Sequence, residues 1–145
     1  MSLGNTNFRP SPATCMEIEK VAVLGAGQMG AGIAQVSACA GYDVVMIDIS
    51  EEFLERGMRT ISSSLEKLVS KGRMSEKDSS SAMSRISSST DRASASEADL
   101  VVEAIPEIPD LKFSTFSELD SICKKEAILA SNTSSISINE IASHT

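Results

Sequence analysis

The sequence predicts an α/β fold in which helices cover both faces of a doubly wound parallel sheet. Short apolar segments typical of strands buried on both faces occur at residues 21–24, 44–47, 99–105 and 127–131. Segments with helical periodicity separate them, and strands that alternate with helices form parallel sheets. With 145 residues, the chain is long enough for one domain with its own core.

The first strand enters a turn whose glycines have the spacing Gly-x-Gly-x-x-Gly. This is the sequence form of a βαβ unit that binds a dinucleotide, the Rossmann fold. The first glycine permits a sharp turn, the second lets a pyrophosphate approach the backbone, and the third permits close helix packing. The following helix, expected at residues 29–40 and ended by Gly41, offers free N–H groups to phosphates. The predicted cofactor site therefore includes Gly25, Ala26, Gly27, Gln28, Met29 and Gly30. The alternative is a tight strand–helix turn that binds no ligand.

Asp48 ends the second strand and indicates which dinucleotide is bound. An acid at this point accepts hydrogen bonds from both hydroxyls of the adenosine ribose and repels a 2′-phosphate. Ile49 and Ser50 offer no compensating cation. The sequence therefore favours NAD over NADP.

Two helices are expected to follow. The first covers residues 51–71, with Ser50 as its N-cap, Gly72 at its end, and an apolar stripe of Leu54, Met58, Ile61, Leu65 and Leu68. The second covers residues 75–85, with Ser75 as its cap. The serine-rich stretch 79–96 leaves two alternatives open, a short strand at 86–90 or a loosely ordered, solvated edge.

The last third of the chain continues the alternation. Pro106 and Pro109 interrupt it, a helix follows at residues 111–125, and another begins at 137–143. The first of these helices is expected to turn inward Leu111, Phe116, Leu119, Ile122 and Cys123. Ligands of such sheets lie beyond the carboxyl ends of the strands. The glycine turn, Asp48, the Glu107 region and residues 132–135 are therefore expected to converge on one crevice.

Composition limits the classes of partner that the chain can bind and the cellular compartments in which it is expected. The net charge of −7 argues against nucleic acid and anionic membranes, and no apolar run approaches the ~18 residues of a membrane span. Cys15, Cys39 and Cys123 are widely spaced, which favours free thiols over a disulfide or a metal site. Residues 1–17 lack the apolar core of a secretory signal and are expected to be a disordered leader to a domain at 18–145. We expect a cytoplasmic protein, with peroxisome and mitochondrion as alternatives.

Three segments, at residues 23–35, 99–107 and 129–138, resemble the N-terminal domain of the 3-hydroxyacyl-CoA dehydrogenases, including the 3-hydroxybutyryl-CoA enzymes. The similarity spans residues 18–145, and the Ser-Asn-Thr-Ser-Ser run is its specific part. The resemblance implies an enzyme of fatty acid metabolism that oxidises (S)-3-hydroxyacyl-CoA to 3-oxoacyl-CoA while hydride passes to NAD.

The resemblance also implies roles for single residues. Ser134 matches the catalytic serine that hydrogen-bonds the reacting 3-oxygen, and Asn132 lies beside it in the cofactor site. Glu107 and Lys112 match positions near the nicotinamide half of the cofactor, while Ser64 and Lys71, two helical turns apart, match contacts to CoA. Without the resemblance, Ser134 would be interpreted as a turn or cap residue, Glu107 as an exposed acid and Lys112 as a helix-surface lysine. Ser64 and Lys71 would belong to a solvated helix flank.

The chain departs from the family after the serine run. The family's general base is a histidine in a Gly-Leu-His-Phe-Phe-Asn-Pro-like segment, and a mostly helical C-terminal domain supplies the acyl pocket and the homodimer contacts. Neither is present, and the single histidine, His144, is expected on the surface. We therefore expect a chain truncated before the C-terminal domain, which binds NAD and is inactive alone. The alternative is a natural short homologue that binds NAD(H) or acyl-CoA without chemistry.

Overall fold

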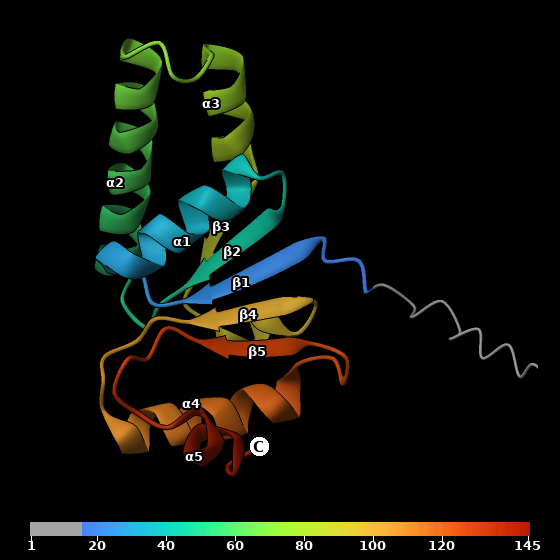
Figure 1. Cartoon of the computed structure of the whole chain (residues 1–145). Coiled ribbons are helices and arrows are strands. Elements are labelled where there is room, and N and C mark those ends of the chain that lie inside the picture. Colours follow the sequence, from blue (N-terminus) through green and yellow to red (C-terminus); the bar gives the residue numbers. More distant parts are fainter. Residues whose placement is uncertain (1–15) are drawn as a thin grey trace, which may run out of the picture.

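The computed structural model of this protein describes residues 16–145, so nearly all of the expected leader lies outside the described residues. One sheet of five parallel strands forms the centre, in the order β3-β2-β1-β4-β5. The strands are β1 (Lys20–Leu24), β2 (Asp43–Ile47), β3 (Ile86–Ser89), β4 (Leu100–Glu103) and β5 (Ile128–Ser131). The predicted doubly wound parallel sheet is confirmed (Figure 1).

Helices cover the two faces of the sheet separately (Figure 1). One face carries α1 (Gln28–Cys39), α2 (Glu51–Ser70) and α3 (Glu76–Ser84), and the other carries η1 (Arg92–Ala95), α4 (Pro109–Ile122) and α5 (Ile138–Ala142). Strand β1 serves both cores by alternation, because Val21 and Val23 face the first helical layer while Ala22 and Leu24 face the second. These residues are almost completely buried, which explains why the strand is a continuous apolar run.

The predicted caps and stripe of the first helical layer are confirmed. The side chains of Ser50 and Ser75 accept hydrogen bonds from the N–H groups of Phe53 and Asp78 at the starts of α2 and α3. In α2, Leu54, Ile61 and Leu65 are buried, and the remaining stripe residues, Met58 and Leu68, pack against the same core. Beyond α2, Gly72 has a φ of +66°, as expected for the residue that ends a helix.

The serine-rich segment contains a strand, which decides between the two alternatives. Strand β3 pairs with β2, and the Ser87 hydroxyl donates to the Val44 carbonyl. The short helix η1 was not anticipated. The Asp91 side chain caps it by accepting from the Ala93 N–H at 2.9 Å, and its Ala95 is fully buried against the second layer. The small alanine and serine side chains of this helix carry too weak an apolar pattern to indicate it from sequence.

Helix α4 begins two residues earlier than expected, at Pro109. Proline lacks an N–H and its φ is already helical, so it suits the first turn of a helix rather than interrupting the chain there. Phe116 and Leu119 are buried as predicted, and Leu111, Ile122 and Cys123 are half-buried.

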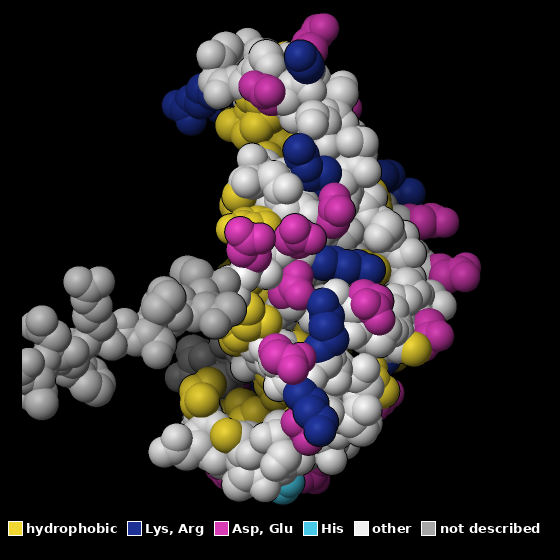
Figure 2. Space-filling view, turned by 90° about the vertical axis from the view of Figure 1, so that its right-hand side faces the viewer, with side chains coloured by type: hydrophobic (Ala, Val, Ile, Leu, Met, Phe, Trp, Pro, Cys, Tyr) yellow, Lys and Arg dark blue, Asp and Glu magenta, His cyan; other side chains and the backbone are white. Residues whose placement is uncertain are grey.

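The carboxyl ends of the five strands are in register. Leu24 of β1 pairs with Ile47 of β2 on one side and with Glu103 of β4 on the other. The outer strands continue this register, since Ser89 pairs with Ile47 and Ser131 pairs with Glu103. The residues that follow therefore share one edge of the sheet. The amino ends face the opposite side, where acidic and basic side chains are interspersed (Figure 2). There Asp99 accepts from the N–H groups of Glu19 and Lys20 and from Lys124 Nζ at 2.7 Å. In the described part of the chain, no helix is long and apolar enough to cross a membrane.

Candidate functional site

The glycine turn joins β1 to α1 at the carboxyl edge of the sheet. Gly25 has a φ of +105°, and a Cβ there would lie 2.5 Å from the carbonyl oxygen of Ala104. A Cβ on Gly30 would lie 1.8 Å from the carbonyl oxygen of Gly25. Both glycines are therefore required by the protein's own backbone, and the close contact of Gly30 is with the turn itself rather than with the strand.

Gly27 differs from these two glycines because a Cβ placed on it would meet no atom of the described residues within 4 Å. The space beside it is open, as the approach of a ligand to the backbone requires. Among residues 16–145, the N–H groups of Gly27, Gln28, Met29 and Gly30 have no protein acceptor. A row of free N–H groups at the start of a twelve-residue helix suits a pyrophosphate, which is negatively charged and accepts hydrogen bonds.

Asp48 lies at the same edge, directly after β2. Its Oδ2 accepts from the Ala26 N–H at 2.9 Å, and its Oδ1 accepts from the Ser50 N–H at 3.1 Å. These bonds fix the carboxylate against the turn without touching the free N–H groups of α1. Each carboxylate oxygen retains acceptor capacity, so Asp48 can still hold ribose hydroxyls.

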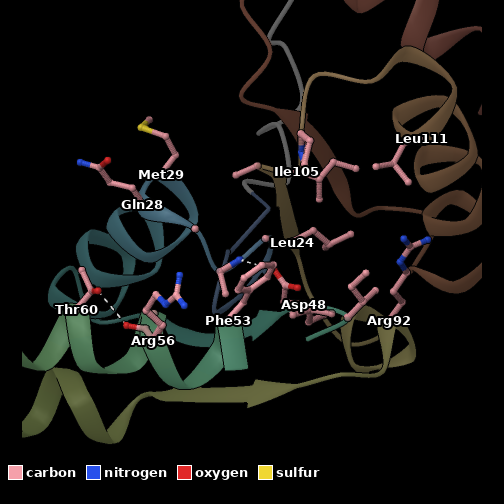
Figure 3. A pocket seen from close by; sticks show the side chains of 18 residues that line it. Leu24, Gln28, Met29, Asp48, Phe53, Arg56, Thr60, Arg92, Ile105 and Leu111 are labelled. Carbon is pink, nitrogen blue, oxygen red and sulfur yellow. Dashed lines mark hydrogen bonds between the residues drawn. The ribbon is translucent and has the colours of Figure 1, made fainter. Parts of the chain in front are cut away.

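Together the turn and Asp48 form one wall of a cleft of about 870 Å³ (Figure 3). The cleft reaches from Gln28 and Met29 on α1, past Asp48, to Ile105 and Leu111 on the other side. Its remaining lining residues are Leu24, Gly25, Ala26, Gly27, Ile47, Ile49, Phe53, Arg56, Gly57, Thr60, Arg92, Ala104 and Pro106. This volume is within the usual range for cofactor pockets.

Helices α2 and η1 also contribute to this cleft, which no motif in the sequence indicated. Phe53, Arg56 and Thr60 of α2 face it, as does Arg92 of η1 (Figure 3). Two cations therefore border the cleft although Ile49 and Ser50 supply none. Arg56 is paired with Glu52 at 3.0 Å and Arg92 with Glu118, so neither charge is uncompensated.

Gly57 of α2 is a further residue of the cleft that was not predicted. A Cβ there would lie 2.9 Å from the carbonyl oxygen of Ala26 and 3.0 Å from Met46 Cε. The glycine lets α2 press against the cofactor turn. Its position inside a helix, where glycine is unfavourable, was the signal that could have identified it.

A group of carboxylates and hydroxyls lies next to the cleft. Glu103, the last residue of β4, and Lys112 of α4 are fully buried and form an ion pair with a Nζ–Oε1 distance of 2.6 Å. Lys112 Nζ also lies 2.9 Å from Glu107 Oε1 and 3.3 Å from the carbonyl oxygen of Ile105. The alternative that Lys112 is a helix-surface lysine is wrong, because the Glu103 carboxylate holds its ammonium inside the protein.

Glu107 connects this group to the segment after β5. Its Oε2 accepts from the hydroxyls of Thr133 at 2.8 Å and Ser135 at 2.7 Å. The bond from Lys112, followed by those from Ser135 and Thr133, lowers the pKa of Glu107 to about 2. Although its side chain is 42% exposed, Glu107 is therefore a fixed carboxylate rather than a free surface acid.

Ser134 lies between these two hydroxyl residues. It is exposed, and its own hydroxyl has no hydrogen-bond partner among residues 16–145. The Asn132 N–H donates to the Glu103 carbonyl at 2.8 Å, which extends the β4–β5 pairing to this point. The expected convergence is therefore incomplete. Of the Glu107 region only Pro106 lines the cleft, and residues 132–135 lie outside it, where Thr133 and Ser135 bond to Glu107.

The residues matched to CoA contacts lie elsewhere, on the second half of α2. The Ser64 hydroxyl accepts from Gln35 Nε2 of α1 at 3.0 Å, and Lys71 is exposed at the C-cap. His144 is exposed, as expected, and its ring stacks on Phe113 of α4 with centroids 4.2 Å apart. Within the described residues, no group of three or more His, Cys, Asp or Glu could hold a metal ion.

The comparisons with known proteins agree with this geometry. A family model described as "3-hydroxyacyl-CoA dehydrogenase, NAD binding domain" matches residues 20–145. A 3-hydroxybutyryl-CoA dehydrogenase of Bradyrhizobium diazoefficiens is 46% identical over 128 residues, which are 88% of this chain and 44% of that protein. A protein of the same name from Mycobacterium tuberculosis is 42% identical over 129 residues, which are 88% of this chain and 45% of that protein.

The crystal structure of (S)-3-hydroxybutyryl-CoA dehydrogenase from Ralstonia eutropha has a TM-score of 0.86 and is 43% identical. The match covers 89% of this chain and 46% of the crystallised one. The chain thus spans a little under half the length of these relatives. It belongs to the 3-hydroxyacyl-CoA dehydrogenase family, of which it carries the NAD-binding domain.

Proposed function

We propose that this chain provides the cofactor-binding part of an enzyme that oxidises (S)-3-hydroxyacyl-CoA to 3-oxoacyl-CoA. The observation that carries the proposal is the row of free N–H groups at the start of α1, facing the same cleft as Asp48. The names of the relatives support the reaction class. They include, at 39% identity over 129 residues, a glyoxysomal fatty acid beta-oxidation multifunctional protein of Brassica napus.

The residues of the cleft divide the binding task among them. The α1 amides compensate the charge of the pyrophosphate, and the positive end of the helix dipole adds to this effect. Asp48 accepts from the ribose hydroxyls while its bonds to Ala26 and Ser50 keep it in place. When bound, NAD supplies the acceptor for the hydride that leaves C3 of the substrate.

The substrate oxygen needs two further groups. The free hydroxyl of Ser134 can donate a hydrogen bond to the 3-oxygen as negative charge develops on it. Removal of the hydroxyl proton needs a base, which typically contributes about 10²–10⁴ in rate. His144 is stacked on Phe113 instead. Residues 1–145 alone are therefore expected to bind NAD and to oxidise 3-hydroxybutyryl-CoA at a negligible rate.

Isothermal titration of the 145-residue protein with NAD⁺ and NADP⁺ tests the proposal. We expect NAD⁺ to bind, NADP⁺ to bind at least ~10-fold more weakly, and Asp48→Ala to remove the preference, because the carboxylate both holds the ribose and repels a 2′-phosphate. Equal affinity for the two coenzymes, or no heat with either, would contradict it.

The second candidate function is binding without chemistry, favoured by the engagement of the single histidine with Phe113. A turnover assay of the same protein with NAD⁺ and 3-hydroxybutyryl-CoA separates the two candidates in part. Turnover near that of a longer relative would exclude the binding module. It would also contradict the expected inactivity of residues 1–145.

A further inference from the structure

We propose that Glu118 of α4 is a second determinant of coenzyme choice, which acts by holding and neutralising the Arg92 guanidinium at the adenosine end of the cleft. Asp48 repels a 2′-phosphate directly, and Glu118 withdraws the cation that would otherwise attract it. Glu118 is a positioning residue, since it acts through Arg92 and is not among the described residues that line the cleft. The inference rests on the proposed function, because it concerns which coenzyme the same cleft selects.

Arg92 reaches the cleft because η1 packs beside the end of β2. The Asp48 N–H donates to the Ser89 carbonyl, so the end of β3 lies beside the acid. Three residues later Arg92 begins η1, which the Asp91 side chain caps and which contacts both β2 and α4. Arg92 consequently lines the same cleft as Asp48, on the side of that acid away from the start of α1 (Figure 3).

This side of the cleft is its adenosine end. The free N–H groups of α1 suit the pyrophosphate and Asp48 suits the ribose hydroxyls, so the adenine lies further along the cleft, toward Arg92. An arginine near this position is the group that accommodates the 2′-phosphate in proteins that bind NADP. Its guanidinium matches a phosphate both in charge and in hydrogen-bond geometry. Asp48 and Arg92 therefore favour opposite coenzymes.

The bond from Arg92 Nη1 to Glu118 Oε2 resolves this conflict in favour of NAD. The Arg92 side chain is 26% exposed, so solvent screens this pair less than the pair of Arg56 and Glu52, in which the arginine is 63% exposed. A 2′-phosphate would have to compete with the Glu118 carboxylate for the guanidinium, and the carboxylate would repel it. The uncharged adenine ring can still stack on the guanidinium plane, so the pairing does not oppose NAD.

The first experiment measures the affinities for NAD⁺ and NADP⁺ by isothermal titration of the 145-residue protein and its Glu118→Ala variant. Weak binding of NADP⁺ is measured by competition against NAD⁺. We expect the affinity for NADP⁺ to rise about fivefold, as for one partly screened ion pair, and that for NAD⁺ to change by less than about twofold. The gain should shrink as the salt concentration is raised, because it depends on a charge that salt screens.

The matched control is Glu55→Ala. Glu55 is also paired with an arginine, Arg59, at 3.8 Å, but the two side chains are 71% and 70% exposed and neither is among the described residues that line the cleft. The variant removes the same charge as Glu118→Ala and should leave both affinities unchanged. An equal rise in the affinity for NADP⁺ would show an effect of net charge alone and overturn the assignment.

The second experiment shows whether Glu118 acts through Arg92. In the Arg92→Met background, Glu118→Ala should change the affinity for NADP⁺ by less than about twofold, since no guanidinium is left to be released. A direct repulsion of the phosphate by Glu118 would instead give the same gain with and without Arg92. That result would overturn the role of Glu118 as a positioning residue.

The double variant of Asp48→Ala with Glu118→Ala removes both determinants of coenzyme choice. It should bind NADP⁺ more tightly than NAD⁺, whereas Asp48→Ala alone only removes the preference. Binding of NAD⁺ by the wild type, with the same ratio of affinities in Glu118→Ala, would overturn this inference and leave the proposed function in place. Failure of the wild type to bind NAD⁺ would overturn both.

Discussion

At the residue scale, the three glycines of the cofactor turn have different physical tasks although they form one motif. Gly25 and Gly30 are dictated by the backbone, because a side chain on either would lie within 2.5 Å of a carbonyl oxygen. Within residues 16–145, no atom lies within 4 Å of a Cβ added to Gly27, so no steric contact requires this glycine. Beyond the modest preference for glycine at an N-cap, the missing side chain matters when a ligand occupies the cleft.

Replacing Gly27 should separate binding from folding. In Gly27→Ala, we expect the free energy of unfolding to fall by no more than ~1 kcal/mol, the cost of losing a favourable N-cap residue. The affinity for NAD⁺ should fall at least ~10-fold, because the methyl group occupies the space of the pyrophosphate. Urea unfolding and isothermal titration measure the two effects.

Gly32→Ala is the matched control, since Gly32 is exposed in the interior of α1 and has no atom within 4 Å of an added Cβ. It should stabilise the protein by up to ~1 kcal/mol and leave the affinity unchanged. Wild-type affinity in Gly27→Ala would show that the cofactor does not approach the backbone there.

Replacing Gly30, unlike replacing Gly27, should strongly destabilise the folded protein. The Cβ of Gly30→Ala would overlap the Gly25 carbonyl oxygen at 1.8 Å, so α1 must move away from the turn. We expect the free energy of unfolding to fall by about 3 kcal/mol, the upper part of the range for overpacking. Urea unfolding checks this, and a loss below that of Gly27→Ala would contradict the contact.

At the element scale, α2 and α3 of the first layer begin at the serine caps that the sequence predicted. Helices α2 and α3 form a hairpin that extends from the sheet (Figure 1). The outer end of the hairpin lies away from the sheet, so we expect local interactions such as capping bonds to contribute more to helix stability there. Ser75, which caps α3, is exposed, and within the described residues its side chain bonds only to the N–H of Asp78.

Removing that cap should weaken α3 without touching the cleft. For Ser75→Ala we expect a loss of about 1 kcal/mol in the free energy of unfolding, the usual effect of a lost serine cap. Ser80→Ala, at an exposed position inside α3, is the control and should be neutral or slightly stabilising. Denaturant unfolding of the three proteins measures this, and equal midpoints would mean that the cap is not formed in solution.

At the scale of the whole molecule, carboxylates fix both ends of the sheet. Glu107 ties α4 to the segment after β5 at the carboxyl edge, and Asp99 ties β1 to Lys124 at the amino edge. The bonds from Lys124 and from the Glu19 and Lys20 N–H groups hold the pKa of Asp99 well below its usual value. Both groups are therefore more acidic in the folded protein than in the unfolded chain.

The stability of the protein should depend on pH accordingly. A carboxyl whose pKa is lowered by folding stabilises the folded state above its unfolded pKa and loses that effect as pH falls toward its folded pKa. For Glu107 this window runs from 4.5 down to about 2. We expect the urea midpoint to be constant from pH 7 to about 5.5 and to fall below pH 4.5.

The variant Glu107→Gln isolates the share of this residue in the acid sensitivity. It should be less stable than wild type at pH 7, and the difference should narrow as the pH approaches 2 because protonation then removes the same charge from wild type. A constant difference across this range would contradict the lowered pKa of Glu107.

Much of the architecture follows from local patterns in the sequence. The continuous apolar run of β1, the spacing of the three glycines and the caps Ser50 and Ser75 each predict an element directly, because each depends on near neighbours in the chain. The stripe of α2 predicts which face is buried for the same reason. Apart from the unexpected helix η1, the corrections concern boundaries, as at Pro109, because proline is accepted in the first turn of a helix but not in the interior of a helix or strand.

The site was predicted unevenly, and distance along the chain explains the difference. The turn and its acid were identified because a motif with a known spacing contains both. The Thr60, Arg56 and Arg92 side chains were missed, since they reach the cleft only through the packing of α2 and η1. Helix η1 itself has no local pattern strong enough to predict it.

The sequence alone determined the parallel sheet, the glycine turn and the acid that follows strand β2, because these depend on short-range chemistry. Only the tertiary structure decided that Lys112 is buried and paired with Glu103. On a helix wheel it is a polar residue that could face solvent, yet β4 brings Glu103 beneath it and the protein buries its charge. Long-range pairing of charges leaves no periodic trace in sequence, and for that reason the buried ion pair of Glu103 and Lys112 is visible only in three dimensions.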